Sequence, residues 1–199
     1  MRKFTGDQLV VATHNKGKLE EISALLAPYG VKITSNDDHG LPEPVEDGVT
    51  FIDNARIKAH AAAKATGLPA LADDSGLSVD ALDGAPGIYT ADWAETPQGR
   101  DFPMAMKKVE DALPADASRK AQFNCTLVLA WPDGHDEVFA GILHGALVWP
   151  MRGENGHGYD PIFQPDGHKQ TCGEMDRWEK NKISHRADAF NKLVTGCFD

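Results

Sequence analysis

The amino-acid sequence predicts a mixed α/β fold, and three observations lead to this prediction. Short apolar runs in the first third of the chain alternate with segments of helical character, as in strand–helix–strand units. Two longer apolar runs in the second half are joined by residues 132–134, a Pro-Asp-Gly hairpin signal. The 199 residues are enough for one domain or for two lobes that share a core. We therefore expect a single domain over residues 1–199 with a mixed sheet.

The chain is expected to begin with a strand, a helix and a second strand. Residues 9–12 form a short apolar run followed by polar residues, which is typical of a buried strand. A helix should follow, because leucine and isoleucine recur at helical spacing until Pro28 and Gly30 end the pattern. Residues 31–34 predict the second strand, and residues 36–48, rich in Asp, Glu, Gly and Pro, predict a loop.

A long helix is predicted over the alanine-rich residues 51–66. Thr50 and Asp53 resemble a capping box at its start. Gly67 and Pro69 should end it, because glycine favours the residue after a helix and proline cannot continue one.

The elements that follow are a strand, a turn and a helix. Residues 69–72 predict a strand that carries Asp73 and Asp74 at its end. Residues 83–87, Asp-Gly-Ala-Pro-Gly, predict a turn, and residues 101–113 predict a helix.

The second half of the chain predicts a hairpin and a final helix. Residues 122–131 and 137–149 are the two hairpin strands. Residues 150–170 are rich in glycine and proline, and so long a connection is usually functional or disordered. The last helix should run over residues 187–198, with Ser184 near its N-cap.

The composition is that of a soluble globular protein, with 41% hydrophobic and 25% charged residues. The formal net charge of −10 disfavours binding to nucleic acids and to anionic membranes, because phosphates repel it. No apolar run approaches the roughly 20 residues that span a bilayer, and the N-terminal residues lack the apolar stretch of a signal peptide. The three cysteines are far apart and odd in number, which indicates reduced thiols and a cytoplasmic location.

The adjacent acids Asp73 and Asp74 are the first candidate functional residues. Two neighbouring carboxylates repel each other, and a bound cation offsets this repulsion. A turn at residues 75–76 would let both acids reach one ion, or let one bind metal while the other acts on water. Glu46 can supply a third oxygen ligand, and a few carboxylates with waters and phosphate oxygens suit Mg²⁺. A solvated turn remains the alternative interpretation.

The expected start of the first helix is a candidate anion site. Free backbone N–H groups and the positive end of the helix dipole favour an anion there, and Gly17 permits close approach of a ligand. The segment lacks the G-x-x-x-x-G-K-[ST] pattern of a P-loop. An ordinary capped helix with solvated lysines is the alternative. The residues are Thr13, His14, Asn15, Lys16, Gly17 and Lys18.

Two segments near the C-terminus are candidates for contact with a base. Residues 156–161, Gly-His-Gly-Tyr-Asp-Pro, offer rings for stacking and a flexible backbone, with a tight surface turn as the alternative. Lys180 and residues 184–186 supply donors. Arg186 can bond the 6-oxo group of a purine, whereas the 6-amino group of adenine would leave this donor unpaired. A helix start with incidental basic residues is the alternative.

Six segments together resemble the inosine/xanthosine triphosphate pyrophosphatase family of house-cleaning nucleotidases. They occur in the order of the family and run from residue 9 to about residue 190. The sequence departs from the family at His157, where phenylalanine is usual, and it matches poorly over residues 93–103. The matching segments are residues 13–18, 50–55, 72–77, 84–89, 158–163 and 179–186.

The resemblance implies an elongated mixed sheet with flanking helices and two lobes around a deep nucleotide-binding cleft, in a protein that is usually a homodimer. It implies Mg²⁺-dependent hydrolysis of the deaminated purine nucleotides ITP, dITP and XTP to the monophosphate and pyrophosphate. A pyrophosphatase for modified pyrimidine nucleotides and a non-catalytic nucleotide sensor remain alternatives.

The resemblance also implies roles for particular residues. Asp74 looks like the general base, with Lys18 as a second catalytic residue that holds the triphosphate. Glu46, Asp73 and Asp74 look like the metal-binding acids. The implied substrate-binding residues are Thr13, His14, Asn15, Lys16, Gly17, Lys18, Ser75, His157, Gly158, Tyr159, Asp160, Lys180, His185 and Arg186.

Overall fold

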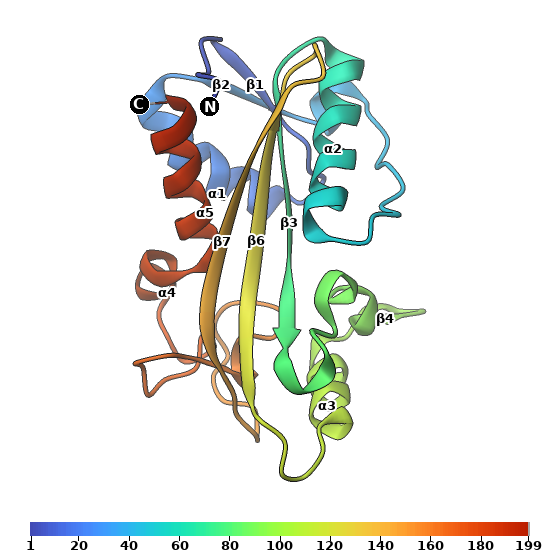
Figure 1. Cartoon of the computed structure of the whole chain (residues 1–199), viewed down its shortest axis with the longest axis vertical. Coiled ribbons are helices and arrows are strands. Elements are labelled where there is room, and N and C mark those ends of the chain that lie inside the picture. The colour runs from blue at the N-terminus through green and yellow to red at the C-terminus, as the bar shows by residue number, and fades with distance from the viewer. Residues whose placement is uncertain (199) are drawn as a thin grey trace. The chain divides into compact units, whose positions relative to one another are not determined.

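A six-stranded mixed sheet forms the centre of the computed structural model, which describes residues 1–198 (Figure 1). The strand order is β2-β1-β3-β6-β7-β8, and a separate two-stranded hairpin pairs β4 with β5. β1 pairs in parallel with β2 and β3, and β8 pairs antiparallel with β7. The predicted mixed α/β fold is therefore confirmed. The strands are β1 Gln8–Val11, β2 Lys32–Ser35, β3 Ala70–Val79, β4 Glu95–Thr96, β5 Gly99–Arg100, β6 Lys120–Ala130, β7 Asp136–Leu147 and β8 Phe163–Pro165.

The helices largely follow the predicted pattern. α2 begins and ends where the sequence predicts, with Thr50 as N-cap and Gly67 in the left-handed conformation after its end. α4 was not predicted, and the last helix begins at residue 185 and gives way to a π-helical turn over Val194–Phe198. None of the helices in residues 1–198 combines the length and apolar character of a membrane span. The α-helices are α1 Lys16–Leu26, α2 Phe51–Thr66, α3 Phe102–Ala112, α4 Arg177–Ile183 and α5 His185–Leu193.

The contacts within the chain divide it into two compact units. Unit 1 comprises residues 1–74, 126–140 and 189–199, and unit 2 comprises residues 75–125 and 141–188. One buried cluster of unit 1 is built of small residues, because six of its ten buried members are alanines of α2 and β3, and Ala12 and Ala130 are two more. The core of unit 2 is built on larger side chains, including the packed rings of Phe123 and Phe163, whose centroids lie 4.2 Å apart.

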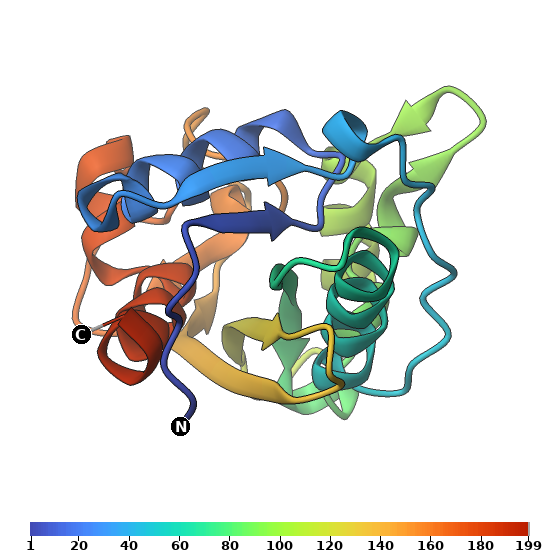
Figure 2. The same cartoon turned by 90° about the horizontal axis from the view of Figure 1, so that it is seen from above.

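Unit 1 is wound in both directions from β1. The chain passes from β1 through α1 to β2 on one side, and from β2 through α2 to β3 on the other side of β1. Right-handed crossovers in opposite directions place α1 and α2 on opposite faces of the sheet. Figure 1 shows α1 and α2 on either side of the upper part of β3, and Figure 2 shows β1 and β2 running the same way.

This winding places the ends of two parallel strands together. Val11 at the end of β1 pairs with Leu71 in β3, so the residues that follow each of them emerge at the same edge. In doubly wound α/β proteins, ligands bind at this edge, where the strand order reverses. The segment at residues 13–18 and the two acids of β3 therefore lie at the expected place for a ligand.

β3, the strand that carries Asp73 and Asp74, is longer than the sequence predicts. Residues 75–76 do not form the predicted turn, because β3 continues to Val79. Leu77 and Val79 are buried, and Asn124 of β6 donates from Nδ2 to Ser78 Oγ at 2.9 Å, so packing and pairing prolong the strand. Successive residues of a strand face opposite sides, which applies to the two acids as well.

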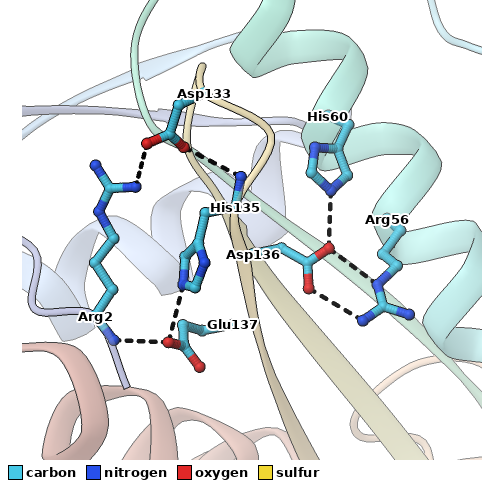
Figure 3. Close-up of polar contacts among 7 residues, drawn as sticks. All are labelled: Arg2, Arg56, His60, Asp133, His135, Asp136 and Glu137. Carbon is cyan, nitrogen blue, oxygen red and sulfur yellow. Dashed lines mark hydrogen bonds and ion pairs between the residues drawn. The ribbon is translucent and has the colours of Figure 1, made fainter.

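Polar contacts tie the β6–β7 turn to α2 and to the N-terminal segment within unit 1 (Figure 3). Asp136 accepts hydrogen bonds from Arg56 Nε and Nη2, at 3.0 and 3.1 Å, and lies 2.8 Å from His60 Nε2. Asp133 accepts from Arg2 Nη1 at 2.6 Å. Burial opposes ionisation of Asp136, but its hydrogen bonds with Arg56 and His60 outweigh burial and lower its pKa.

We predict that Asp136→Asn lowers the free energy of unfolding by about 1 to 2 kcal/mol at neutral pH, because charge-assisted hydrogen bonds are lost. The folded-state pKa of Asp136 is lowered, so its stabilisation is present above the unfolded pKa and is lost as pH falls through the folded pKa. The difference between variant and wild type should therefore shrink in acid. Urea unfolding measured over a pH series tests this.

The matched control is Asp133→Asn, which removes a carboxylate whose side chain is 58% exposed. Its expected cost is clearly smaller than that of Asp136→Asn, because solvent screens an exposed ion pair. Equal losses for the two variants, or an Asp136→Asn loss that does not change with pH, would contradict the assignment.

Candidate active site

The two acids of β3 face different partners within unit 1. Asp73 Oδ2 lies 2.7 Å from Nζ of Lys18, which comes from the first turn of α1. Asp74 Oδ1 lies 3.8 Å from Nζ of Lys58, and its Oδ2 accepts a hydrogen bond of 3.3 Å from Nδ2 of Asn54; both of these residues belong to α2. The helices on the two faces of the sheet thus each supply a lysine to one acid.

Lys58 also joins Glu46 to the cluster. Its Nζ lies 2.9 Å from Glu46 Oε2, and its side chain is only 12% exposed. Burial lowers the pKa of Lys58, but Asp73, Asp74 and Glu46 together outweigh burial, so the pKa is raised and the ammonium form is stabilised. We refer to Lys18, Glu46, Lys58, Asp73 and Asp74 as the charge cluster.

Lys58 is a candidate functional residue that the sequence analysis missed. A lysine in a long helix is usually solvated, so Lys58 was not considered a candidate from the sequence. A signal was nevertheless present, because Lys58 lies four residues after Asn54 and next to Ala59, on the side of α2 that faces the sheet. Positions four apart on a helix share a face, and a lysine beside buried alanines has little access to water.

A close backbone approach holds the segment that carries Glu46. The Gly48 amide donates to Asn54 Oδ1 at 2.9 Å. A Cβ at residue 48 would lie 2.6 Å from both Asn54 Oδ1 and Asp53 Cβ, so only glycine fits there without a shift. The Asn54 amide therefore connects the Gly48 backbone on one side to Asp74 on the other.

Asp74 has the electrostatic character of a general base. Burial is the largest influence and raises its pKa, Lys58 lowers it, and Glu46 raises it again, for a value of about 6. A carboxylate with this pKa is mostly ionised at neutral pH, and it is a stronger base than an ordinary aspartate.

The predicted anion site lies between β1 and α1. Asn15 is the N-cap of α1, and its Oδ1 accepts from the Lys18 amide at 3.2 Å. Thr13 Oγ1 accepts from the Asn15 amide at 3.1 Å, and His14 Nδ1 lies 2.6 Å from Asp37 Oδ1. Lys16 and Gly17 occupy the first turn of α1, where backbone amides are available to an anion.

The charge cluster fits a divalent cation by its chemistry. Glu46, Asp73 and Asp74 offer the oxygen ligands that Mg²⁺ prefers. Within residues 1–198, however, no three side chains of His, Cys, Asp or Glu are gathered closely enough to hold an ion. The carboxylates instead face the ammonium groups of Lys18 and Lys58, so the three acids would hold a cation after a change in these pairings.

The glycine-rich segment of residues 156–161 lies in unit 2, and its backbone packs around a buried carboxylate. Asp160, 2% exposed, accepts from the His157 amide at 2.9 Å and binds the ammonium group of Lys180. Gly156 has a φ of +76°, and a Cβ there would lie 2.1 Å from Asp160 Oδ2. The carboxylate of Asp160 therefore organises the loop from within.

Tyr159 does not offer its ring to a ligand from the surface. The residue is 2% exposed, its hydroxyl donates to the Thr90 carbonyl at 2.8 Å, and its ring packs edge-on against Phe102 with centroids 5.7 Å apart. Burial raises its pKa, so the phenol stays protonated. Of the two rings that the sequence offered for stacking, that of His157 belongs to an exposed residue.

The remaining predicted residues lie on or beside α4, α5 and β3. Ser184 is buried and its Oγ accepts from the Ala187 amide at 3.1 Å, which confirms it as a cap of α5. The His185 ring lies 5.2 Å from that of Phe123, and Arg186 follows in the first turn of α5. Ser75 belongs to β3.

The fold and the site define a doubly wound α/β protein that presents an anion-binding helix start beside a group of carboxylates and lysines. The chain belongs to the Ham1 family, whose model matches residues 9–196. The family resemblance seen in the sequence is thereby confirmed.

Similar proteins match along nearly the whole chain. A Ruegeria pomeroyi protein named dITP/XTP pyrophosphatase is 66% identical, over 99% of this chain and 98% of that protein. One of the same name from Agrobacterium fabrum is 54% identical, with both chains fully covered. Among solved structures, a HAM1 protein from Coxiella burnetii has a TM-score of 0.90 and 40% identity, covering 94% of this chain and 96% of the other.

We predict that Gly156→Ala lowers the free energy of unfolding by about 1 to 3 kcal/mol more than Gly167→Ala. Both residues have left-handed backbone, with φ of +76° and +79°, so both alanine variants incur similar backbone strain. Only the Cβ at residue 156 meets Asp160, whereas nothing lies within 4 Å of one at residue 167. Urea unfolding of the two variants measures the difference, and equal losses would show that the Asp160 contact does not constrain the loop.

Proposed function

We propose that the protein is a Mg²⁺-dependent pyrophosphatase that hydrolyses the deaminated purine nucleotides ITP, dITP and XTP to the monophosphate and pyrophosphate. The observation that carries the proposal is the charge cluster, in which a basic carboxylate, Asp74, lies among lysines beside the helix start at residues 13–18. The names of the Ruegeria pomeroyi and Agrobacterium fabrum relatives support this reaction.

The triphosphate would bind at the start of α1. The amides of the first turn and the ammonium group of Lys18 are donors to phosphate oxygens, and the positive end of the helix dipole adds to this attraction. Negative charge grows on these oxygens during hydrolysis, so the same donors also stabilise the transition state.

Asp74 would take a proton from the attacking water. The water oxygen forms a bond to phosphorus, the bond that links the α- and β-phosphate groups breaks, and the proton goes to an oxygen of Asp74. Glu46, Asp73 and Asp74 would hold Mg²⁺, which supplies charge neutralisation and polarises a phosphoryl oxygen. The Asn54 amide, hydrogen-bonded to Asp74 at 3.3 Å, holds the base in position.

Unit 2 would recognise the base. Arg186 can donate to the 6-oxo group of hypoxanthine or xanthine, whereas it would meet another donor at position 6 of adenine. His157 offers an exposed ring for stacking. Lys180 and His185 are further polar groups, and the Asp160 contacts keep the loop of residue 157 in one conformation.

We infer further that the protein acts in the cytoplasm as a homodimer. Cys125, Cys172 and Cys197 are buried and form no disulfide in residues 1–198, as suits a reducing compartment. Burial raises the pKa of Cys172 to about 12 and that of Cys197 to about 11, which keeps both thiols unreactive. The homodimer rests on the family resemblance.

The expected substrate profile follows from the donor role of Arg186. We predict that ITP, dITP and XTP are hydrolysed faster than ATP by a factor on the order of 10² to 10⁴, because the 6-amino group of adenine cannot accept from Arg186. Pyrophosphate and orthophosphate should be measured separately, with and without Mg²⁺. Equal rates for ITP and ATP, a preference for modified pyrimidine nucleotides, or release of orthophosphate alone would each refute the proposal.

The role of Asp74 is tested by Asp74→Asn, which keeps the shape of the side chain but removes the base. We predict a fall in kcat of about 10² to 10⁴-fold, with binding of ITP retained. Asp111→Asn is the control, because that exposed carboxylate belongs to unit 2 and forms its ion pair with Lys107 on the same helix, outside the charge cluster. Turnover retained in Asp74→Asn would remove this residue from the role of base.

A further inference from the structure

The charge cluster is nearly neutral without any metal ion. Lys18 Nζ lies 2.7 Å from Asp73, and Lys58 Nζ lies 2.9 Å from Glu46 and 3.8 Å from Asp74. Two ammonium groups thus offset two of the three carboxylate charges. All five side chains belong to unit 1, so these distances lie within one compact body.

Burial makes these pairings strong. The side chains of Asp73, Lys58 and Asp74 are 4%, 12% and 15% exposed. Charges with so little access to water must be paired, and removal of one partner leaves the other uncompensated. Lys58 therefore stays with Glu46 and Asp74 until another cation or a new anion changes the balance.

The position of Lys58 between Glu46 and Asp74 disfavours binding of a divalent cation there. An ion bound to both Glu46 and Asp74 would lie within about 2 to 3 Å of their oxygens, the region that the ammonium group now occupies. Two cations at such spacing repel strongly in a poorly solvated site. In agreement, residues 1–198 contain no ready group of three His, Cys, Asp or Glu ligands.

A bound nucleotide supplies anions to which the ammonium group of Lys58 can move. Its phosphates are anions, and they would bind at the α1 start, where Lys18 already lies. The ammonium group of lysine is a point charge on a flexible stem of four carbons, so it can move from a carboxylate to a phosphate without a backbone change. The carboxylates released in this way would then be available to the metal.

We propose that Lys58 is a place-holder for the divalent cation: the nucleotide-free protein binds the metal weakly, and the nucleotide phosphates draw Lys58 away and bring the metal into the site. This inference rests on the proposed function, because it takes a nucleotide as the ligand. It adds an order of binding and gives Lys58 a positioning role toward the metal.

The test uses Mn²⁺ as the probe and measures free Mn²⁺ by electron paramagnetic resonance during titration of the nucleotide-free protein. Wild type should bind weakly, and Lys58→Met should bind at least about tenfold more tightly, because the competing charge is gone. Lys58→Arg keeps the charge and should stay weak. Lys64→Met removes an exposed lysine from the same helix and should match wild type.

Thermal melting gives a second measurement that does not depend on turnover. Without metal, Lys58→Met should melt below wild type, because Glu46 and Asp74 then lack their cation. Added Mn²⁺ should raise the melting temperature of Lys58→Met more than that of wild type. An equal rise in both proteins would overturn the proposal, as would tight binding of Mn²⁺ by the nucleotide-free wild type.

A last arm adds an ITP analogue whose α–β bridge cannot be hydrolysed. It should tighten Mn²⁺ binding to wild type beyond the affinity of the analogue alone for Mn²⁺, and it should tighten binding to Lys58→Met less. An equal gain in both proteins would count against the place-holder. The Mn²⁺ results with nucleotide-free protein do not depend on turnover of ITP, so failure of this inference and failure of the proposed function are separable.

Discussion

The pairing of two adjacent carboxylates with lysines from different helices is the interaction on which the proposed site depends. Asp73 and Asp74 are consecutive in a strand, and alternation of side chains sends them to opposite faces of the sheet. The doubly wound topology places one helix on each face, and each helix provides one lysine. Each acid can be charged in a buried position because the fold brings a cation to it from its own side.

The pairing with different lysines gives Asp73 and Asp74 different environments. Asp73 is held close to Lys18 at the start of α1, where phosphate is expected to bind. Asp74 has longer contacts, with Asn54 at 3.3 Å and with Lys58 at 3.8 Å, and burial raises its pKa. A carboxylate of raised pKa suits proton transfer, whereas a carboxylate 2.7 Å from an ammonium group suits fixed charge. Topology and electrostatics thus favour the same division of roles.

The sequence predicted the elements whose ends carry strong local signals. Helix 51–66 was predicted in full because Thr50 and Gly67 mark its two ends. The end of β3 was not predicted, because two aspartates followed by Ser-Gly are typical of a turn, and only pairing with β6 and burial of Leu77 reveal the longer strand.

The candidate site was predicted from the sequence to a similar extent. The acids and the segment at residues 13–18 have recognisable chemistry, and the structure places both at the switch point of the sheet in unit 1. Lys58 was missed and Tyr159 was expected at a ligand, because exposure depends on packing between distant segments and not on residue type.

A crystal structure with Mg²⁺ and an ITP analogue whose α–β bridge resists hydrolysis would test the central claim most directly. The account predicts the triphosphate at residues 13–18, Mg²⁺ on oxygens of Glu46, Asp73 and Asp74, and Lys58 Nζ moved from Glu46 to a phosphate oxygen. A triphosphate bound away from α1, or Mg²⁺ bound while Lys58 keeps its contact with Glu46, would contradict it.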